Sequence, residues 1–222
     1  MWIRYVVVGC VSLFAACGSG TDATPDEESA AEVAETIEAP LPAVIVAERG
    51  GFIPEGIEYD SANGRLLVGS LAEGSVFHIH ADGRVTAVVT DPELVSSVGI
   101  EVDEPRNRIL VANSDRSVFE GSGQGQAKLG IYELSSGTRI AMIDLAATIA
   151  DAPADLAHFA NDVAVAADGS AYVTDTMAGV IYRVGTDHQA SVFFDPDSPE
   201  PLGFNGIVAH PDGYLLVAAG ST

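Results

Sequence analysis

Apolar and polar residues alternate through most of the chain after residue 43, and Gly, Asn and Asp interrupt the alternation at short intervals. A period of two predicts β-strands, and the interrupting residues predict tight antiparallel turns. Four segments share this pattern of strand, turn and second apolar strand. They are 55–70 (EGIEYDSANGRLLVGS), 98–113 (VGIEVDEPRNRILVAN), 161–176 (NDVAVAADGSAYVTDT) and 205–220 (NGIVAHPDGYLLVAAG).

Three of these segments continue into a further hairpin, at 75–90, 128–145 and 179–194. The four segments begin 43, 63 and 44 residues apart. Four antiparallel strands in a repeat of about 40–45 residues are typical of one blade of a β-propeller. The sequence therefore predicts an all-β fold, a β-propeller whose blades each contain strands A to D from the central channel outward.

The repeats amount to about three and a half blades, which form an incomplete ring over residues 43–222. The short run AVIVAE (Ala43–Glu48) can serve as a spare outer strand. A closed propeller of six such blades needs about 260 residues. We therefore expect the sequence to be a C-terminally truncated piece of a longer protein.

The second repeat is longer than the others because of two loops, at 114–127 and 146–160. In the blade geometry both loops lie on the face where strand A begins, which we call the top. Long insertions confined to one face of a repeat protein usually mark its binding face. The Gly-rich stretch GSGQGQ (121–126) within the first loop is read as a flexible lid.

Equivalent residues of successive blades point toward the same channel. The position placed just before strand A is occupied by Glu55, Val98, Asn161 and Asn205. A carboxylate and two amide oxygens at one channel mouth are hard ligands, which suit calcium better than zinc. The alternative is that these side chains only form local turns with the backbone. We predict a metal site at Glu55, Asn161 and Asn205.

A second set of equivalent positions lies at the end of strand B and includes Asn113 and Asp175. These two side chains are predicted to orient ligands or to contact substrate, or to be plain surface residues. Asp162 is predicted to be a turn residue or a support for the metal ligands. His158, in the top loop before Asn161, is a candidate proton carrier and the only catalytic candidate among the five His residues.

The first sixteen residues predict a lipoprotein signal peptide, with Arg4 before a short apolar stretch. Cys17 is then the lipidated first residue of the mature chain; an ordinary secretory signal is the alternative. Residues 17–42 contain seven acidic residues and no basic or aromatic residue, which predicts a disordered linker. The predicted location is the cell envelope, on the outer membrane.

The whole chain is strongly acidic, with 32 Asp and Glu residues against 10 Lys and Arg residues. Nucleic-acid binding needs clustered basic residues, so it is excluded as a function class. Solubility, or a cationic partner such as a metal ion, fits this charge better. No Gly-x-Ser-x-Gly motif and no phosphate-binding loop occurs in the sequence.

The motifs PEGIEYD, FANDVAVAADGSAYVTDT and GFNGIVAHPDGYLLVA resemble the regucalcin/gluconolactonase family of six-bladed propellers, and more distantly the paraoxonases and strictosidine-synthase-like proteins. The resemblance runs from about Pro54 to the end. It implies a divalent cation, often calcium, with Glu55 and Asn205 as ligands and Asn161 binding the metal or the substrate. An Asp of a later blade, which that family uses as ligand and general base, has no counterpart in this sequence.

The resemblance implies a calcium-dependent hydrolase of lactones or related esters, in which the cation polarises a carbonyl or phosphoryl oxygen and activates water. We expect this fragment to be inactive and the hydrolase to be active only when complete. The small-molecule substrate would bind at the top of the channel. The alternative is a non-catalytic envelope propeller that binds a ligand or a protein on its top face.

Overall fold

The computed structural model describes residues 41–196 and 202–221, which form fifteen strands and three short 3-10 helices. The strands are β1 (Pro54–Asp60), β2 (Arg65–Ser70), β3 (Ser75–Ile79), β4 (Val85–Thr90), β5 (Ser96–Asp103), β6 (Arg108–Ser114), β7 (Gly125–Gln126), β8 (Lys128–Glu133), β9 (Arg139–Asp144), β10 (His158–Val165), β11 (Ala171–Asp175), β12 (Val180–Val184), β13 (Ala190–Phe194), β14 (Leu202–Ala209) and β15 (Leu215–Ser221). The helices are η1 (Glu104–Arg106), η2 (Arg116–Glu120) and η3 (Ala146–Thr148). None of the helices in these two ranges is long and apolar enough to cross a membrane.

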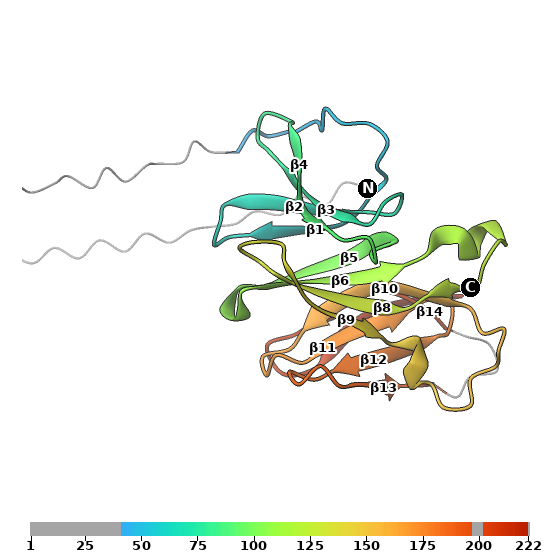
Figure 1. Ribbon diagram of the computed structural model, residues 1–222. Coiled ribbons are helices and arrows are strands. Elements are labelled where there is room, and N and C mark those ends of the chain that lie inside the picture. Colours follow the sequence, from blue (N-terminus) through green and yellow to red (C-terminus); the bar gives the residue numbers. More distant parts are fainter. Residues whose placement is uncertain (1–40, 197–201, 222) are drawn as a thin grey trace, which may run out of the picture. The chain divides into compact units, whose positions relative to one another are not determined.

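The strands pair into blades that follow one another in chain order (Figure 1). Blade 1 contains β1 to β4, blade 2 contains β5, β6, β8 and β9, and blade 3 contains β10 to β13. In the described residues the fourth blade has its strands A and B, β14 and β15, which pair with each other. This order confirms the predicted partial propeller. The spare outer strand predicted at Ala43–Glu48 is wrong: this segment forms no strand, and its Glu48 amide donates to the Gly83 carbonyl in the β3–β4 turn (2.8 Å).

Every strand A contains a β-bulge at the same repeat position, where two residues oppose one residue of strand B. The paired residues on either side are Glu55 and Ile57, Ser97 and Ile100, Ala160 and Val163, and Phe204 and Ile207. Each bulge contains the residue that was predicted to lie just before strand A, followed by one more residue. The pairs are Glu55 and Gly56, Val98 and Gly99, Asn161 and Asp162, and Asn205 and Gly206. A bulge locally increases the twist and redirects side chains, so it controls what each strand presents to the channel.

Consecutive blades pack on each other through apolar faces. After the bulge, Ile57, Ile100, Val163 and Ile207 each oppose a Val of strand B. In blades 2 to 4 this residue faces the preceding blade. The next residue along, such as Ala164 in blade 3, faces the following blade. Three separate hydrophobic clusters result, one between each pair of consecutive blades. Short strands with continuous apolar runs therefore fit a propeller rather than a sheet with one solvated face.

Charged pairs hold the bottom corners of the first two blades. Arg65 binds Asp60 (2.6 Å) and also donates to the Leu134 carbonyl of blade 2 (2.6 Å). Arg108 repeats this arrangement with Asp103 (2.7 Å) and donates to the Gly169 carbonyl of blade 3 (2.6 Å). Each Arg thus satisfies a buried carboxylate and links its own blade to the next one.

Candidate functional site

The structure brings Glu55, Asn161 and Asn205 to one cavity of about 280 Å³. The cavity lies where the bulges of β1, β10 and β14 approach one another, with β5 on its wall. These residues lie within strand A, at its bulge, and not before the strand as predicted. Pairing continues past the bulge, as in Pro54 with Ser70, which extends each strand A toward the top.

Three further carboxylates line the same cavity: Glu58, Glu101 and Asp162. Glu58 and Glu101 occupy equivalent positions in blades 1 and 2, three residues after Glu55 and Val98 respectively. Strict alternation would turn residues three apart to opposite faces of a strand. The bulge between them cancels this reversal, so Glu55 and Glu58 face the same cavity. Sequence analysis missed Glu58 and Glu101, although their shared repeat position was a readable signal.

The cavity brings four partly buried carboxylates together. Burial raises the pKa of Glu55, and the nearby charge of Asp162 raises it further. Burial raises the pKa of Glu101 to about 7, and the charge of Glu58 adds to this effect. The pKa of Glu58 and the pKa of Asp162 are also raised, mainly by burial. The lining residues include no Arg, Lys or His, so no side chain there compensates these carboxylates.

Asp162 joins three blades at the cavity. Its carboxylate accepts a hydrogen bond from the backbone N–H of Ile207 in blade 4 (2.9 Å). On the opposite side, a Cβ added at Gly99 of blade 2 would collide with the same carboxylate. Glycine at that bulge therefore leaves the space that the Asp162 side chain fills. This position was predicted as a turn or supporting residue, and its contacts with backbone on both sides fit a supporting role.

The oxygen donors of the cavity suit a hard cation. In the described ranges, no group of three or more His, Cys, Asp or Glu side chains could hold a metal ion. A cation in this cavity would therefore need the amide oxygens of Asn161 and Asn205 in addition to the carboxylate of Glu55. An all-oxygen set of carboxylate and amide ligands is typical of calcium. The uncompensated carboxylates give the cavity the charge that such an ion requires.

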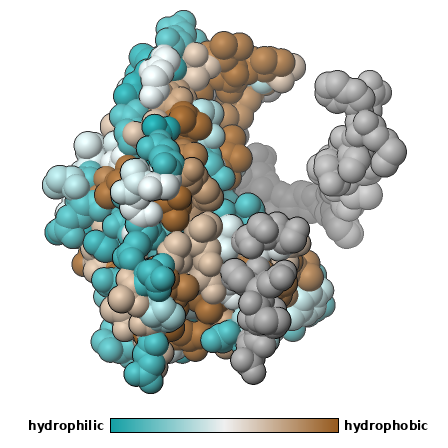
Figure 2. Space-filling view, turned by 90° about the vertical axis from the view of Figure 1, so that its right-hand side faces the viewer, coloured by the Kyte–Doolittle hydropathy of each residue, from teal (hydrophilic) through white to brown (hydrophobic). Residues whose placement is uncertain are grey.

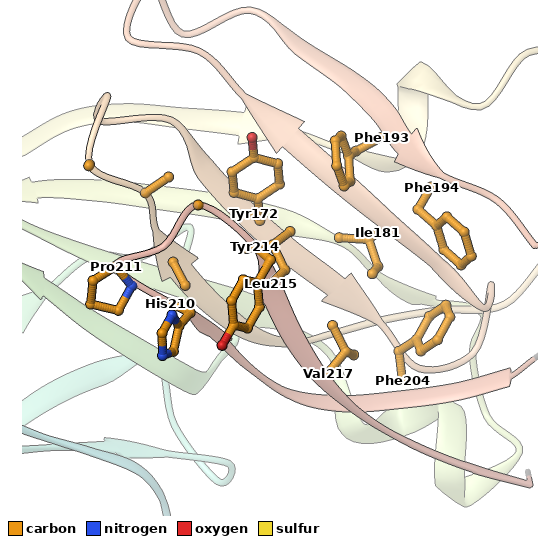
Figure 3. A pocket seen from close by; sticks show the side chains of 14 residues that line it. Tyr172, Ile181, Phe193, Phe194, Phe204, His210, Pro211, Tyr214, Leu215 and Val217 are labelled. Atoms are coloured by element: carbon orange, nitrogen blue, oxygen red, sulfur yellow. The ribbon is translucent and has the colours of Figure 1, made fainter.

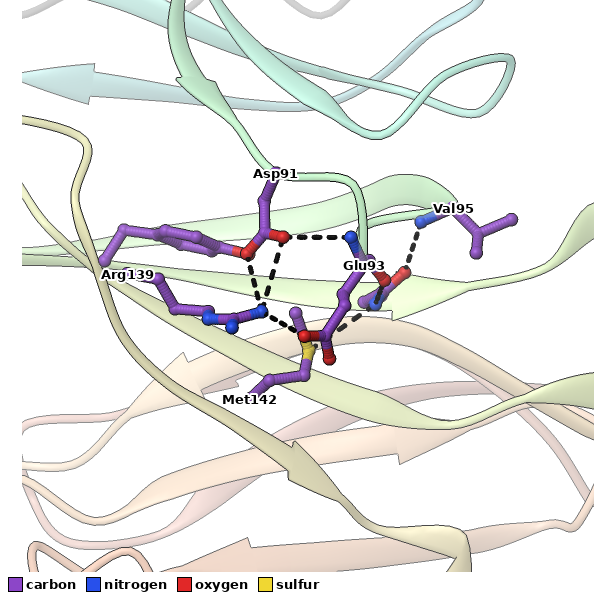
Figure 4. A network of polar contacts seen from close by, with 7 residues as sticks. Asp91, Glu93, Val95, Arg139 and Met142 are labelled. Atoms are coloured by element: carbon purple, nitrogen blue, oxygen red, sulfur yellow. Dashed lines mark hydrogen bonds and ion pairs between the residues drawn. The ribbon is translucent and has the colours of Figure 1, made fainter.

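Asn113 does not reach this cavity, because it is fully buried and its amide is completely used. Its Oδ1 accepts from the Val95 backbone N–H (2.9 Å) and from Gln126 (2.9 Å), and its Nδ2 donates to the Glu93 carbonyl (2.8 Å). Figure 4 shows the neighbouring network, in which Arg139 binds Asp91 (3.2 Å) and Glu93 (2.6 Å). Asn113 thus fixes the loop that connects blade 1 to blade 2.

Asp175 and His158 also lie outside the cavity lining and contact each other. His158 Nδ1 is 2.8 Å from Asp175 Oδ2, which also accepts from the Tyr182 hydroxyl (3.0 Å). The other oxygen of Asp175 accepts backbone N–H groups, including that of Phe159 (2.8 Å). Asp175 is fully buried, and these contacts tie the end of strand B to the start of strand A. The structure brings neither residue to the candidate cation site.

The two long loops of the top face pack on each other. Gln124 donates to the Ala154 carbonyl (2.6 Å), and the Gln124 carbonyl accepts from the His158 backbone N–H (2.8 Å). Within GSGQGQ, β7 pairs in parallel with β10. The flexible lid predicted for this stretch is therefore wrong at β7, which is held by strand pairing.

A second cavity, of about 500 Å³, is apolar and lies between blade 3 and the hairpin of β14 and β15 (Figure 3). Aromatic residues surround it, among them Tyr172, Phe193, Phe194 and Phe204. Phe194 is 45% exposed, whereas Val89, at the same repeat position in blade 1, is fully buried beneath blade 2. This cavity therefore lies on the face of blade 3 that packs against the following blade. In blade 1 the equivalent face is covered by residues of blade 2, such as Tyr132 and Leu134.

No family model matches the chain, and no curated protein sequence matches it. Solved structures do match. A virginiamycin B lyase from Staphylococcus aureus, bound to quinupristin, is 14% identical, with 77% of this chain and 50% of that chain covered and a TM-score of 0.55. A proposed gluconolactonase is 19% identical, with 80% and 60% covered and a TM-score of 0.53.

A PQQ-bound aldose sugar dehydrogenase from Streptomyces coelicolor is 17% identical, with 79% of this chain and 58% of that chain covered and a TM-score of 0.51. The chain spans about half the length of these proteins. At such identities the likeness concerns the fold and not the activity. The chain shares the β-propeller fold of the gluconolactonase-like structures and contains part of the ring.

Proposed function

We propose that the chain is the metal-binding part of a divalent-cation-dependent hydrolase that acts on lactones or related esters. The observation that carries this proposal is the acidic cavity between blades, where Glu55, Asn161 and Asn205 converge without any basic side chain. Calcium is the proposed ion. Glu55 would supply the charged ligand, and the two Asn residues would supply neutral oxygens. When bound, the ion would polarise the ester carbonyl.

Glu101 is the proposed proton acceptor for the attacking water. Its carboxylate lines the cavity, and its pKa of about 7 lies near neutral pH, where a general base is most effective. Asp162 would hold strand β14 of blade 4 at the site through its hydrogen bond from the Ile207 backbone N–H. The substrate would enter from the top face.

The proposed location is the cell envelope, with a lipid anchor at Cys17. Cys17 lies outside the described residues, so this part of the proposal rests on the N-terminal sequence alone. A Cys17→Ser variant should leave the membrane fraction, and a variant that stays there would contradict the anchor.

Calcium titration calorimetry on the full chain tests the site. We expect Glu55→Gln and Asn205→Leu each to weaken calcium binding by about tenfold or more, since each removes one ligand. Glu120→Gln, which removes a carboxylate from η2 outside the cavity, should leave the affinity unchanged. Equal affinity in all four proteins would sink the metal assignment.

Hydrolysis of a panel of lactones and aryl phosphotriesters, with and without a chelator, tests the reaction. Chelator-sensitive turnover that Glu101→Gln abolishes, with calcium binding retained, supports the proposed base. Calcium binding without any turnover would instead favour the alternative, a propeller that binds a ligand without transforming it.

A further inference from the structure

Two Asn-Gly pairs occur in the sequence, Asn63–Gly64 and Asn205–Gly206. An Asn followed by Gly is chemically labile, because the backbone nitrogen of the glycine can attack the side-chain carbon of the Asn and no Cβ obstructs it. Asn205 lines the acidic cavity, whereas Asn63 lies in the turn between β1 and β2. A change from amide to acid at position 205 would therefore alter the charge of the candidate cation site.

The β-bulge of β14 places the reacting groups of Asn205 and Gly206 next to each other. The two residues together oppose one residue of β15, so they do not have separate partners in the ladder. The Gly206 backbone N–H donates instead to Asn205 Oδ1 (2.8 Å). The side chain of Asn205 is thus folded back onto the nitrogen that would attack it.

Thr174 of blade 3 supports the same reaction. Its hydroxyl donates to the Asn205 backbone carbonyl (2.7 Å), and its oxygen accepts from the Asp162 N–H (3.1 Å). This carbonyl belongs to the peptide group that contains the Gly206 nitrogen. When that nitrogen loses its proton, negative charge spreads onto the carbonyl oxygen, where a fixed donor stabilises it as an oxyanion hole does. Thr174 is fully buried, so its hydroxyl is held in place.

The surroundings of Gly206 leave room for the side chain of Asn205 to close onto the backbone. Apart from chain neighbours, Asp162 Oδ2 is the one described atom that a Cβ built on Gly206 would approach within 4 Å, at 3.7 Å. The φ of Gly206 also lies outside the left-handed region, so alanine fits this backbone as well. Glycine here is therefore not required by the fold, and it keeps the path of attack open.

Asn63 is held in a different way. Its Nδ2, the nitrogen that would leave as ammonia, donates to both carboxylate oxygens of Asp60 (3.1 and 2.8 Å). These bonds fix the Asn63 amide on Asp60, which is itself fully buried. The same dipeptide thus occurs once with its amide fixed on another side chain and once with its amide folded onto the glycine nitrogen.

We propose that Asn205 is a site of deamidation in the folded chain. The Gly206 nitrogen gives its proton to solvent and bonds to Asn205 Cγ. The Cγ–Nδ2 bond then breaks, and the departing nitrogen takes up a proton and leaves as ammonia. Water opens the resulting cyclic imide at either of its carbonyls, which leaves aspartate or isoaspartate at position 205. The reaction consumes water and releases ammonia, and nothing is oxidised or reduced.

The consequence for the cavity rests on the proposed function. Aspartate at position 205 would add a carboxylate to Glu55 and the other ligands and strengthen calcium binding, because calcium affinity depends on ligand charge. Isoaspartate would insert a side-chain carbon into the backbone of the bulge and displace the ligand oxygen. The time since synthesis would therefore change the charge of the site.

Peptide mapping by mass spectrometry tests the proposal on the full chain. Neither calcium nor substrate is present, so a failure here is distinct from a failure of the proposed function. Hydrophobic residues reach the surface on the side of the molecule shown in Figure 2, so dilute protein in mild detergent is used to avoid aggregation. The chain is incubated at mildly alkaline pH in heavy-oxygen water, both native and in urea. Conversion is followed at Asn205 and Asn63 by the mass shift from amide to acid.

In the native chain we expect Asn205 to convert at least about tenfold faster than Asn63, and in urea we expect similar rates at both residues. Thr174→Val and Gly206→Ala should each slow the conversion of Asn205 by about tenfold or more and leave that of Asn63 unchanged. Gly206→Ala keeps the test valid if Thr174→Val fails to fold. A rate ratio that is the same in native protein and in urea would overturn the proposal, as would undiminished conversion in both folded variants.

Discussion

The joint between blades 2 and 3 and the two ends of the blade series are built from the same repeat, yet they differ sharply in burial. At the joint, Leu110 and Val163 are inaccessible to water within a cluster from both blades. At the ends, Ile57 and Leu216 occupy corresponding rows and are more than half exposed. A blade therefore has no core of its own: its apolar side chains are buried only where another blade covers them, as in other repeat architectures.

The largest expected effect comes from breaking the joint. Leu110→Ala should lower the free energy of unfolding by about 3 kcal/mol, because it leaves a cavity in a fully buried cluster. Leu216→Ala, at a half-exposed position of β15, should cost less than about 0.5 kcal/mol. Urea denaturation of both variants at low protein concentration measures the difference. Equal losses of unfolding free energy in the two variants would show that Leu216 is buried to the same extent as Leu110.

A smaller effect is expected from the carboxylate enclosed between blades. The pKa of Glu101 is raised to about 7 in the folded protein, above its ordinary value of 4.5. Between these two pH values the unfolded chain is ionised at this residue while the folded chain holds its proton. Stability should therefore fall as pH rises from 4.5 to 7 and then level off, by on the order of 2 kcal/mol.

Glu101→Gln should remove most of this pH dependence and make the protein more stable above pH 7. Thermal unfolding from pH 5 to pH 8, in the presence of a chelator, is the measurement. Glu120→Gln is the control, since this exposed carboxylate lies outside the cavity. A wild-type stability that rises over this interval would contradict the sign of the argument.

The smallest effect is expected at Phe194, and Val89 at the same repeat position of blade 1 is its buried counterpart. Phe194→Ser should cost about 1 kcal/mol, because its ring is already partly in water, whereas Val89→Ser should cost about 3 kcal/mol at a fully buried position. Differential scanning calorimetry of the two variants sharpens the comparison between the open and the covered face. A larger loss for Phe194→Ser would mean that the apolar cavity in Figure 3 is closed in solution.

Strand order and fold class were predictable because a period of two and turn residues such as those at Asp168–Gly169 are local signals. Ala43–Glu48 misled the same reasoning. Its apolar run meets strand propensity, but Glu48 bonds to the Gly83 carbonyl in a turn and no ladder forms. Tertiary contacts decided that segment, and they leave no trace in the local pattern.

For the site, comparing repeats was sufficient to group Glu55, Asn161 and Asn205, which line one cavity. Alternation then failed for Glu58 and Glu101. A bulge lies between Glu55 and Glu58, and an equivalent bulge precedes Glu101, so each of these side chains faces the opposite side from the one that strict alternation predicts. Asn113 and His158 were predicted near the site because the end of strand B and the loop before strand A both lie on the top face. Their side chains instead bind Gln126 and Asp175, which depends on packing that no repeat alignment contains.

The bulge in each strand A also limits how the repeat can vary in length. Removing Gly206, for example, would turn two residues opposite Ala218 into one and leave the residues on both sides with their present partners. A deletion in β14 after the bulge would exchange the row that faces blade 3 for the row on the opposite face of the strand. Within strand A, insertions and deletions that preserve both rows are thus confined to the bulge, whereas the loops between strands can vary freely in length.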